Sequence, residues 1–414
     1  MHMLLVHQFF LNQNGSGGSR FNQFVKYWEE QGHTITVLAG TVNYTTGMKD
    51  SKYKGKFITE ERISPSVKVL RCHVSEGYNK NFIGRLFGYF SFNLSSTFAL
   101  FKVKKADVIV VTSPPLFVGI TGIIAKTLKR KPLIFEVRDL WPESAIDTGI
   151  LTSRPIIQLA YLIEKFSYKA ADRINVLTPA FKNKLVVDKE VSEDKIIYIP
   201  NGADSDIFIP KEDVGWVREK YQLKDKFIIT YMGAHGLANN LISLLKAAKK
   251  IKNIDQDVHF MLIGDGMKKK ELVEYANQHG LDNVTFIDAQ PKESMPDFCN
   301  TSNLCTAILQ DNDTFKTVYP NKVFDYMSCK KPILLGIDGI ARDLVEKNDA
   351  GIYVSPNNTD EMVDTILSLK GNRKRLNEMG INGYNFVVEN FERKTLAKKY
   401  ISHMEELVND KKNV

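Results

Sequence analysis

The sequence has few cysteines, and they are not spaced as pairs. The four are Cys72, Cys299, Cys305 and Cys329, with neither a CxxC pair nor a His/Cys pattern of metal-ligand spacing. We therefore expect reduced thiols, as in a cytoplasmic protein, rather than a disulfide framework or a zinc module. Long apolar runs are lacking too, so no segment is expected to span a bilayer. The first residues, MHMLLVHQFF, lack the basic start and small-residue cleavage site of a signal peptide, and we interpret them as a first strand.

Low-complexity segments and short repeats are also missing. Of the 414 residues, 43% are hydrophobic and 25% are charged, which predicts two folded domains rather than disorder. The net charge of +8 favours an anionic partner, which is a nucleotide diphosphate, an acidic membrane leaflet or a nucleic acid. Lys and Arg are spread through both halves without a basic-aromatic module, so we expect no nucleic-acid partner.

Strand and helix patterns alternate through both halves of the chain. The first half runs from HMLLVHQFF through ADVIVVTS and KPLIFEVRD to KIIYIPN, and the second from KFIITYMG through DVHFMLIGDG to AGIYVS. This alternation predicts an α/β fold with two doubly wound parallel sheets. The turn-rich segment YIPNGADSDIFIPKEDVGWV separates the halves, so we place the domain boundary between residues 203 and 204. Folds of this kind bind ligands at the carboxyl ends of their strands, here expected in a cleft.

The run PNKVFDYMSCKKPILL predicts a turn, a helix and a buried strand in succession. Pro320 suits the first turn of a helix, and Val323 lies on its apolar face. The free N–H groups at this helix start, near Asn321, favour a phosphate, and Lys322 adds a positive charge. Asp325 is expected to project from the first turn and to accept hydrogen bonds from ribose hydroxyls. The ILLG that follows is typical of a strand buried on both faces.

Two glycine turns of the second half are expected at the same sheet edge. YMGAHG places Gly233 and His235 after one strand, and LIGDG places Gly264 and Asp265 after the next. The first turn leads into a helix whose start is expected at the ligand-binding edge of the sheet, and the second is consistent with an ordinary strand-to-helix turn. His235 is either a helper for the diphosphate or a surface loop histidine.

Two loops of the first half carry the remaining polar candidates. NQNGSGGSR holds Gly17 and Gly18 before a helix, and is either a tight turn or a loop that faces a ligand. In FEVRDLWPES a buried strand ends at Arg138 and Asp139, and Glu143 follows shortly after. Charges at such a strand end are costly unless they are paired or functional, so they are either a structural pair or part of the site.

An apolar residue recurs at steps of three and four between residues 81 and 105. The series is Ile83, Phe87, Phe90, Leu94, Phe98 and Phe101, with Lys80, Arg85, Lys102, Lys104 and Lys105 at the ends. The spacing predicts one or two amphipathic helices. Such a helix either packs on the sheet of the first half or meets an anionic membrane surface and a polyprenyl-linked acceptor.

Several of these strings together resemble one large family. PNKVFDYMSCKKPILL is similar to the C-terminal signature of retaining glycosyltransferases of the GT-B fold, in which Asp325 matches the second of two glutamates and Thr317 stands at the first. IPNGADSDIF resembles the hinge of that family at Asn201, Gly202 and Asp204. RDLWPE resembles bacterial transferases that build O-antigen and capsule repeats, some of which move N-acetylated deoxysugars such as fucosamine.

The resemblance implies two Rossmann-like domains that face a cleft, with residues 1–203 binding the acceptor and residues 204–385 the nucleotide sugar. Residues 386–414 are then a helix that returns to the first domain. It implies transfer from a UDP-linked N-acetylated hexose or deoxyhexose to a polyprenyl-diphosphate-linked or glycan acceptor, with no metal or other cofactor. Backbone groups near Ala289 and Gln290 read the uracil.

The same resemblance sets the expected roles of the charged residues. Arg138, Asp139 and Glu143 face the acceptor and the reacting centre, and Lys322 carries leaving-group charge. The Arg and Lys that serve the diphosphate in much of the family are absent from residues 236–245, so the helix start, Lys322, His235 and the N–H of Gly233 are expected to serve instead. The alternatives are an enzyme like UDP-N-acetylglucosamine 2-epimerase and a sugar-nucleotide-binding partner without catalysis.

Overall fold

The computed structural model describes residues 1–10, 20–42, 47–77, 82–212 and 215–411, which form two compact units. Unit 1 comprises Met1–Pro200 and Lys394–Val414, and unit 2 comprises Asn201–Arg393. The chain thus enters unit 2 three residues before the boundary expected at 203–204. The chain leaves unit 2 after Arg393, whereas the helix that returns to the first domain was expected to begin at residue 386. No helix in the described part of the chain is long and apolar enough to cross a membrane.

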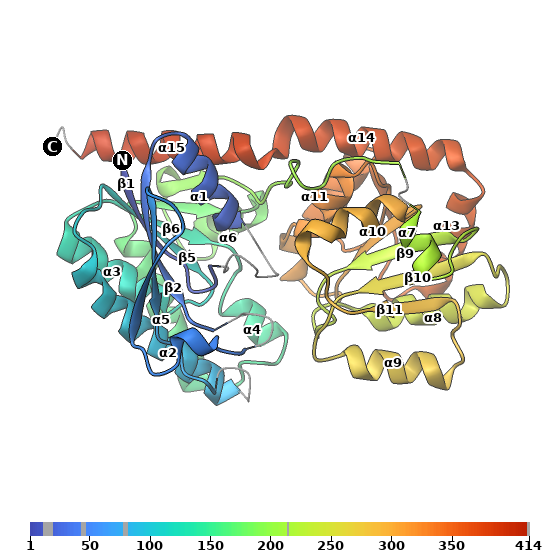
Figure 1. The fold of residues 1–414 in the computed structure, drawn as a ribbon, viewed down its shortest axis with the longest axis horizontal. Helices are drawn as coiled ribbons and strands as arrows, with labels where there is room; N and C mark the ends of the chain where they lie inside the picture. Colours follow the sequence, from blue (N-terminus) through green and yellow to red (C-terminus); the bar gives the residue numbers. More distant parts are fainter. Residues whose placement is uncertain (11–19, 43–46, 78–81, 213–214, 412–414) are drawn as a thin grey trace. The chain divides into compact units, whose positions relative to one another are not determined.

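Unit 1 is built on a sheet of eight strands with the order β3-β4-β2-β1-β5-β6-β7-β8 (Figure 1). Neighbouring strands are parallel except β3 and β4, which form an antiparallel edge pair. The strands are β1 (His2–Val6), β2 (Thr34–Gly40), β3 (Ile58–Arg62), β4 (Val67–Cys72), β5 (Val108–Ser113), β6 (Leu133–Val137), β7 (Arg173–Val176) and β8 (Ile196–Tyr198).

Helices cover both faces of this sheet, as the alternation predicted. They are α1 (Arg20–Glu30), α2 (Phe82–Ala99), α3 (Val118–Lys129), α4 (Glu143–Asp147), α5 (Arg154–Ala170), α6 (Pro179–Val187) and α15 (Arg393–Asp410). The short 3-10 turns are η1 (Ser51–Tyr53), η2 (Leu100–Lys102) and η3 (Glu193–Lys195). On one face, Trp28 of α1 and Tyr400 of α15 meet edge to face over the strand residues, with 5.5 Å between ring centroids. The final helix is therefore part of the unit 1 core.

On the opposite face, α3 packs closely on β5 because Gly122 has no side chain. A Cβ atom at Gly122 would come within 2.9 Å of Val111. Helix α2 packs against α3 through small polar residues, where the Ser96 hydroxyl and the Asn93 amide reach the Thr121 hydroxyl at 2.9 and 3.0 Å. The six apolar residues of the series from Ile83 to Phe101 all lie on the outside instead. Helix α2 also contacts β2 and β4, so the interpretation as a helix that packs on this sheet is confirmed, although its apolar stripe faces outward. Periodicity shows a stripe but not which face of the helix is buried.

Unit 2 has a second, fully parallel sheet of six strands in the order β11-β10-β9-β12-β13-β14. The strands are β9 (Phe227–Met232), β10 (Val258–Ile263), β11 (Val284–Ile287), β12 (Leu304–Ile308), β13 (Ile333–Gly336) and β14 (Gly351–Tyr353). Its helices are α7 (Trp216–Lys220), α8 (Leu241–Lys252), α9 (Lys269–Gln278), α10 (Met295–Thr301), α11 (Asn321–Ser328), α12 (Ile340–Lys347), α13 (Thr359–Lys370) and α14 (Arg373–Phe391), with 3-10 turns η4 (Lys292–Ser294) and η5 (Phe315–Thr317).

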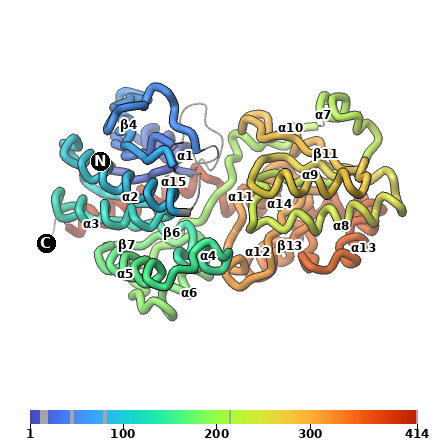
Figure 2. Tube along the Cα trace, turned by 90° about the horizontal axis from the view of Figure 1, so that it is seen from below, coloured from blue at the N-terminus to red at the C-terminus, as the bar shows by residue number. Residues whose placement is uncertain are grey.

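Strand β13 is the ILLG run, and it is buried on both faces as predicted. Ile333 and Leu335 belong to the core on one side of the sheet, whereas Leu334 belongs to the core on the other. Two doubly wound, mainly parallel sheets confirm the predicted α/β fold class. In both views α14 lies beside α11 (Figures 1 and 2).

Candidate functional site

Helix α11 begins at Asn321, one residue after Pro320, which the sequence had predicted to lie in the first turn. Pro320 precedes the first turn with φ −66° and ψ 130°, an extended conformation that residues before a helix commonly adopt. The N–H of Val323 already donates to the Pro320 carbonyl at 3.0 Å. The N–H groups of Asn321 and Lys322 therefore remain as the donors of the helix start.

The Tyr326 side chain fixes α11 on the sheet. Its hydroxyl accepts a hydrogen bond from the Met232 N–H at 2.9 Å and donates one to the Thr306 carbonyl at 3.2 Å. Met232 ends β9 and Thr306 lies in β12, so one side chain ties the helix to two neighbouring strands. The helix start is consequently held in a fixed position at the carboxyl end of β9.

The Lys322 ammonium lies over the turn that follows β9. It sits 3.6 Å from the centre of the Tyr231 ring, and a Cβ atom at Gly233 would come within 2.7 Å of it. Among the described residues no carboxylate or hydrogen-bond acceptor pairs with this ammonium. Burial lowers the pKa of Lys322 to about 7. A half-buried cation without an anion, next to a helix start, is suited to receive an anionic ligand.

Glycine is required where the two turns meet. Gly264 has φ +144°, and a Cβ atom there would lie 1.9 Å from the Gly233 carbonyl oxygen. The N–H of Gly264 donates to the Ile287 carbonyl at 2.9 Å, which ties the turn to β11. The N–H of Gly233 donates to the Ile263 carbonyl at 2.9 Å, so the expectation that this N–H serves the diphosphate is wrong. The two turns expected at one sheet edge are thus in direct contact, and any larger residue at Gly264 forces them apart.

His235 lies beneath these turns and is fully buried, so its interpretation as a surface histidine is wrong. Its backbone N–H donates to the carbonyl of Asp265 at 2.9 Å, while the Asp265 side chain is exposed. Within the described residues, both ring nitrogens lack a hydrogen-bond partner. Burial, with Lys269 and Lys322 nearby, lowers the pKa of His235 to about 4, so the ring is neutral at pH 7.

Asp325 lies in the second turn of α11, rather than in the first turn as expected. Burial raises the pKa of this carboxyl, and the positive charges of Lys292 and Arg393 oppose that rise. The same two cations pair with Asp204, which is buried. Asp325 therefore shares its positive surroundings with a second acidic side chain.

Asp204 joins the first and last segments of unit 2. Arg393 donates to the Asp204 carboxylate and to the Gly202 carbonyl. The N–H of Ala203 donates to the Phe391 carbonyl at 2.9 Å. The predicted hinge residues Asn201, Gly202 and Asp204 thus lie beside the end of α14. Sequence reasoning missed Lys292 and Arg393, because their partners are far away along the chain and neither lies in a recognisable motif.

The positions expected to contact the sugar and the base lie elsewhere around the sheet edge. Thr317 is buried in η5, and its hydroxyl donates to the Thr314 carbonyl at 2.5 Å, so it is engaged locally. Ala289 is exposed after β11, and the Gln290 amide donates to the Asp288 carbonyl at 3.0 Å.

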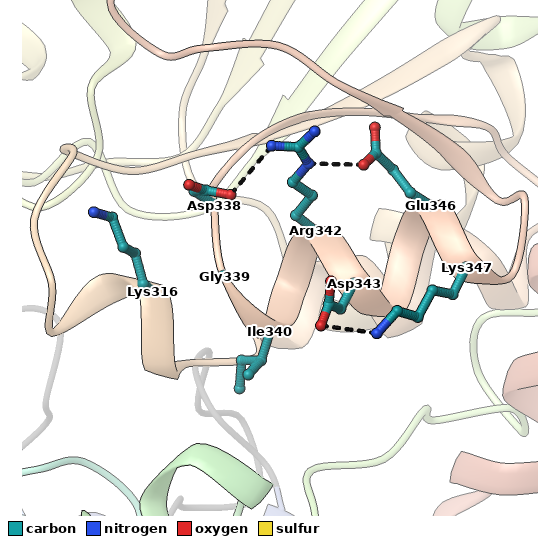
Figure 3. Close-up of a pocket in the computed structure, with 8 residues that line it drawn as sticks. All are labelled: Lys316, Asp338, Gly339, Ile340, Arg342, Asp343, Glu346 and Lys347. Carbon is teal, nitrogen blue, oxygen red and sulfur yellow. Dashed lines mark hydrogen bonds and ion pairs between the residues drawn. The ribbon is translucent and has the colours of Figure 1, made fainter.

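A hollow beside α12 borders the η5 turn (Figure 3). Arg342 reaches between two carboxylates, at 3.5 Å from Asp338 and 2.7 Å from Glu346, and Lys347 pairs with Asp343 at 3.0 Å. The charges that line the helix side of this hollow therefore neutralise one another. It offers no unpaired group comparable to Lys322.

The charged residues of RDLWPE follow β6 in unit 1. Asp139 accepts a hydrogen bond from the Ser144 hydroxyl at 2.8 Å, and burial raises the pKa of its carboxyl. Burial, together with the positive charge of Arg138, lowers the pKa of His7 well below its usual value. Glu143 forms an ion pair with Lys189. The same lysine also pairs with Glu164 at 2.9 Å. Glu143 is thereby held within a local ion cluster.

A buried network that the sequence did not indicate anchors the end of unit 1. The Arg20 guanidinium donates to Glu136 at 3.0 Å and to the Ile199 carbonyl at 2.8 Å, and Asn175 donates to the same carboxylate at 3.0 Å. Arg20 is the first residue of α1. Gly17 and Gly18, the loop glycines expected to face the donor, lie outside the described residues.

Two family models match the chain, one in each half. The model "Glycosyl transferase 4-like domain" matches residues 15–202, and "Glycosyl transferases group 1" matches residues 216–386. WcaI of Escherichia coli K12, named for colanic acid biosynthesis, is 24% identical over 320 residues, which are 75% of this chain and 77% of WcaI. An Escherichia coli UDP-Gal:alpha-D-GlcNAc-diphosphoundecaprenol alpha-1,3-galactosyltransferase is 30% identical over 44% of this chain and 46% of its own.

Solved structures show the same fold at low sequence identity. Sucrose-phosphate synthase from Thermosynechococcus elongatus superposes with a TM-score of 0.75 at 16% identity, over 99% of both chains. Anabaena HepE in complex with UDP gives a TM-score of 0.71 at 15% identity, over 98% of this chain and 100% of its own. The chain therefore combines a glycosyltransferase 4-like domain with a glycosyltransferase group 1 domain, and it is a glycosyltransferase of the GT-B fold.

Proposed function

We propose that the chain transfers a sugar from a UDP-linked donor to a lipid-linked or polysaccharide acceptor in surface glycan biosynthesis, with retention at the anomeric carbon. One observation carries the donor half of this proposal. The Lys322 ammonium, which has no anionic partner among the described residues, lies over Gly233 at the start of α11. A nucleoside diphosphate supplies the missing negative charge at this place.

The diphosphate then receives donors from both the backbone and a side chain. The N–H groups of Asn321 and Lys322 point from the helix start, and the Lys322 ammonium neutralises the leaving-group charge. The turns at Gly233 and Gly264 are proposed to border the phosphates, with the Lys322 ammonium lying where a side chain of Gly233 would be. His235 contributes a neutral ring behind them, with two nitrogens able to bond water or ligand.

The nucleoside is proposed to extend along the same sheet edge. Asp325 accepts hydrogen bonds from the ribose hydroxyls, which requires the ionised carboxylate that Lys292 and Arg393 favour. Backbone groups near Ala289 and Gln290 contact the base, with Asp265 and Val323 bordering the site. Uridine is supported by the solved relatives described with UDP, and by the UDP-linked donor in the name of the galactosyltransferase relative.

The acceptor is proposed to meet unit 1 at the end of β6. Arg138 and Asp139 directly follow that strand, and their charges suit an acceptor hydroxyl or an acceptor diphosphate. We propose a supporting role for Glu143, since its carboxylate is paired with Lys189. The diphosphoundecaprenol acceptor in the name of the galactosyltransferase relative supports a polyprenyl-linked acceptor, and WcaI supports a polysaccharide context. For an N-acetylated hexose or deoxyhexose, the only support is the RDLWPE string.

The proposed reaction involves no metal. Charge on the departing UDP is stabilised by Lys322 and by fixed backbone donors, and no protein nucleophile is invoked. Retaining transfer then occurs on one face of the sugar: the acceptor oxygen bonds to the anomeric carbon as the bond to UDP breaks, and the hydroxyl proton passes to the departing diphosphate. We expect donor turnover to persist in EDTA, and a requirement for added Mg²⁺ or Mn²⁺ would contradict this part of the proposal.

The deciding experiment compares nucleotide binding and turnover in the same preparation. Calorimetric titration with UDP, GDP, ADP and TDP identifies the base, and Asp325→Ala is expected to weaken the preferred ligand at least about tenfold through lost ribose bonds. Lys270→Ala, an exposed site on α9, is the matched control. Release of UDP from UDP-sugars that depends on an added polyprenyl-diphosphate glycan then shows transfer. Binding without any turnover would favour the non-catalytic alternative, and turnover without acceptor would favour the epimerase.

A further inference from the structure

The outer face of helix α2 carries a stripe of large apolar side chains that the fold leaves uncovered. Each of the six is between 46% and 72% exposed, and they recur at steps of three or four residues along α2 and η2. The stripe consists of Ile83, Phe87, Phe90, Leu94, Phe98 and Phe101. Phenylalanine rarely occupies such positions in a series, because each exposed ring forgoes the free energy of burial.

The neighbouring helices extend this surface. Helix α3 packs against α2 on one side and α5 on the other, and α2 and α3 lie side by side in Figure 2. On α5, Leu159, Leu162 and Phe166 are each about half exposed. A hollow between α3 and α5 is lined mainly by isoleucines and Phe166. A second hollow, lined by Phe57, Phe98 and Phe101, lies next to η2. The apolar surface therefore spans three helices.

Charges around this surface are almost all positive. Residues 82–105, 118–130 and 154–170 together contain ten Lys and Arg residues and a single carboxylate, Glu164, while Lys126 pairs with Asp172 just after α5 at 2.8 Å. Glu164 does not offset them at the surface, because it is buried and paired with Lys189 at 2.9 Å. Lys102, Lys104 and Lys105 follow directly after the stripe and are exposed. An apolar surface with a cationic rim is complementary to an anionic lipid leaflet.

The net positive charge of the chain lies in unit 1. Unit 1 contains 32 Lys and Arg residues against 20 Asp and Glu residues, whereas unit 2 contains 24 against 28. The formal charge of the whole chain is +8, so unit 2 is acidic while unit 1 is strongly basic. An anionic surface therefore attracts unit 1 and orients it, while it repels unit 2.

We propose that the outer face of α2, η2, α3 and α5 is a docking surface for an anionic membrane leaflet. The phenylalanine and leucine side chains enter the boundary between headgroups and acyl chains, and the lysines pair with lipid phosphates. A second copy of the chain is a poorer occupant, since a two-fold interface places the two cationic rims against each other. Lysine is also depleted at interfaces between proteins. The inference is independent of the donor chemistry.

Vesicle sedimentation of the full chain, without nucleotide or acceptor, tests the proposal. We expect binding to phosphatidylcholine vesicles that contain phosphatidylglycerol, little binding to phosphatidylcholine alone, and release by salt. The apolar variant is Phe87→Ser/Phe90→Ser/Phe101→Ser, and its expected loss is at least about tenfold. The charge variant is Lys102→Glu/Lys104→Glu/Lys105→Glu, with an expected loss of about fivefold for each lysine removed.

Matched controls lie on unit 2. Ile254→Ser/Met267→Ser/Val388→Ser changes exposed apolar residues there, and Lys246→Glu/Lys249→Glu changes exposed lysines of α8. Both control variants should bind as the unaltered chain does, and thermal unfolding verifies that all variants are folded. Absence of binding to anionic vesicles, or equal loss in the controls, would overturn the proposal. So would a dimer in solution that the apolar variant dissociates. Failure here leaves the transferase proposal intact, because no sugar transfer is measured.

Discussion

Binding of UDP should weaken as the pH rises above neutrality, because the cation proposed to receive the diphosphate loses its proton. Burial lowers the pKa of Lys322 to about 7 in the free protein, while an adjacent diphosphate favours the charged form and raises that pKa. A ligand that binds the protonated form must therefore draw a proton from solution at higher pH. The terminal phosphate of UDP titrates near about pH 6, below this window, and does not mask the effect.

The size of the effect follows from the protonated fraction. With a pKa of about 7, half of the free protein carries the ammonium at pH 7 and about one hundredth at pH 9, so affinity falls about 50-fold between them. At pH 8 each UDP should take up about 0.9 proton. Calorimetric titration in two buffers with different ionisation enthalpies measures this uptake directly.

Two variants separate Lys322 from other groups that titrate. Lys322→Met should bind UDP weakly and with little pH dependence between pH 7 and pH 9, whereas Lys270→Met on the exposed face of α9 should keep the full dependence. If the unaltered protein binds UDP equally at both pH values and takes up no proton, Lys322 does not carry the diphosphate charge. In that case the proposal that the donor binds at the start of α11 is also wrong.

Other predictions concern the supports of the same site. Gly264→Ala places a Cβ atom 1.9 Å from the Gly233 carbonyl and should weaken UDP binding in calorimetry, whereas Gly280→Ala, with no atom within 4 Å, should not. Tyr326→Phe removes the bonds to β9 and β12 and should lower the free energy of unfolding by about 1–3 kcal/mol in urea titration. Asp204→Asn leaves two cations without their carboxylate, and should cost about 3–5 kcal/mol in the unfolding transition reported by Trp216 of unit 2, leaving the unit 1 transition in place.

The fold class followed from local patterns, whereas the strand order did not. Each strand-to-helix alternation is visible within a short window of sequence, so two parallel α/β sheets could be predicted. The start of α11 after Pro320 and the buried strand ILLG were predictable for the same reason. The order of the parallel strands depends on pairing between segments far apart in the chain, such as β1 with β5, which no local pattern records.

Periodicity and spacing did not predict which side of a helix, or which loop residue, is buried. The stripe from Ile83 to Phe101 was recognised, but the buried face of α2 is formed by Ser96, Asn93 and their neighbours, which bond to Thr121. A hydroxyl-lined helix contact resembles a solvent-facing side in sequence, so periodicity leaves open which face of α2 is buried. The burial of His235 could not be predicted for a similar reason, since burial of a loop residue depends on neighbouring turns.

The least predictable feature is the link between the proposed ribose carboxylate and the two ends of unit 2. Asn201 begins the unit and Arg393 ends it, and the pairing of Arg393 with Asp204 fastens these ends together. Lys292 contacts Asp204 and also lies in the field of Asp325, and burial beside Arg393 lowers its pKa to about 8. Ribose hydroxyls that bond to Asp325 favour its ionised form, and that negative charge in turn favours the protonated form of Lys292. Donor binding is therefore expected to strengthen the ion pairs that hold the entry and exit of the chain together.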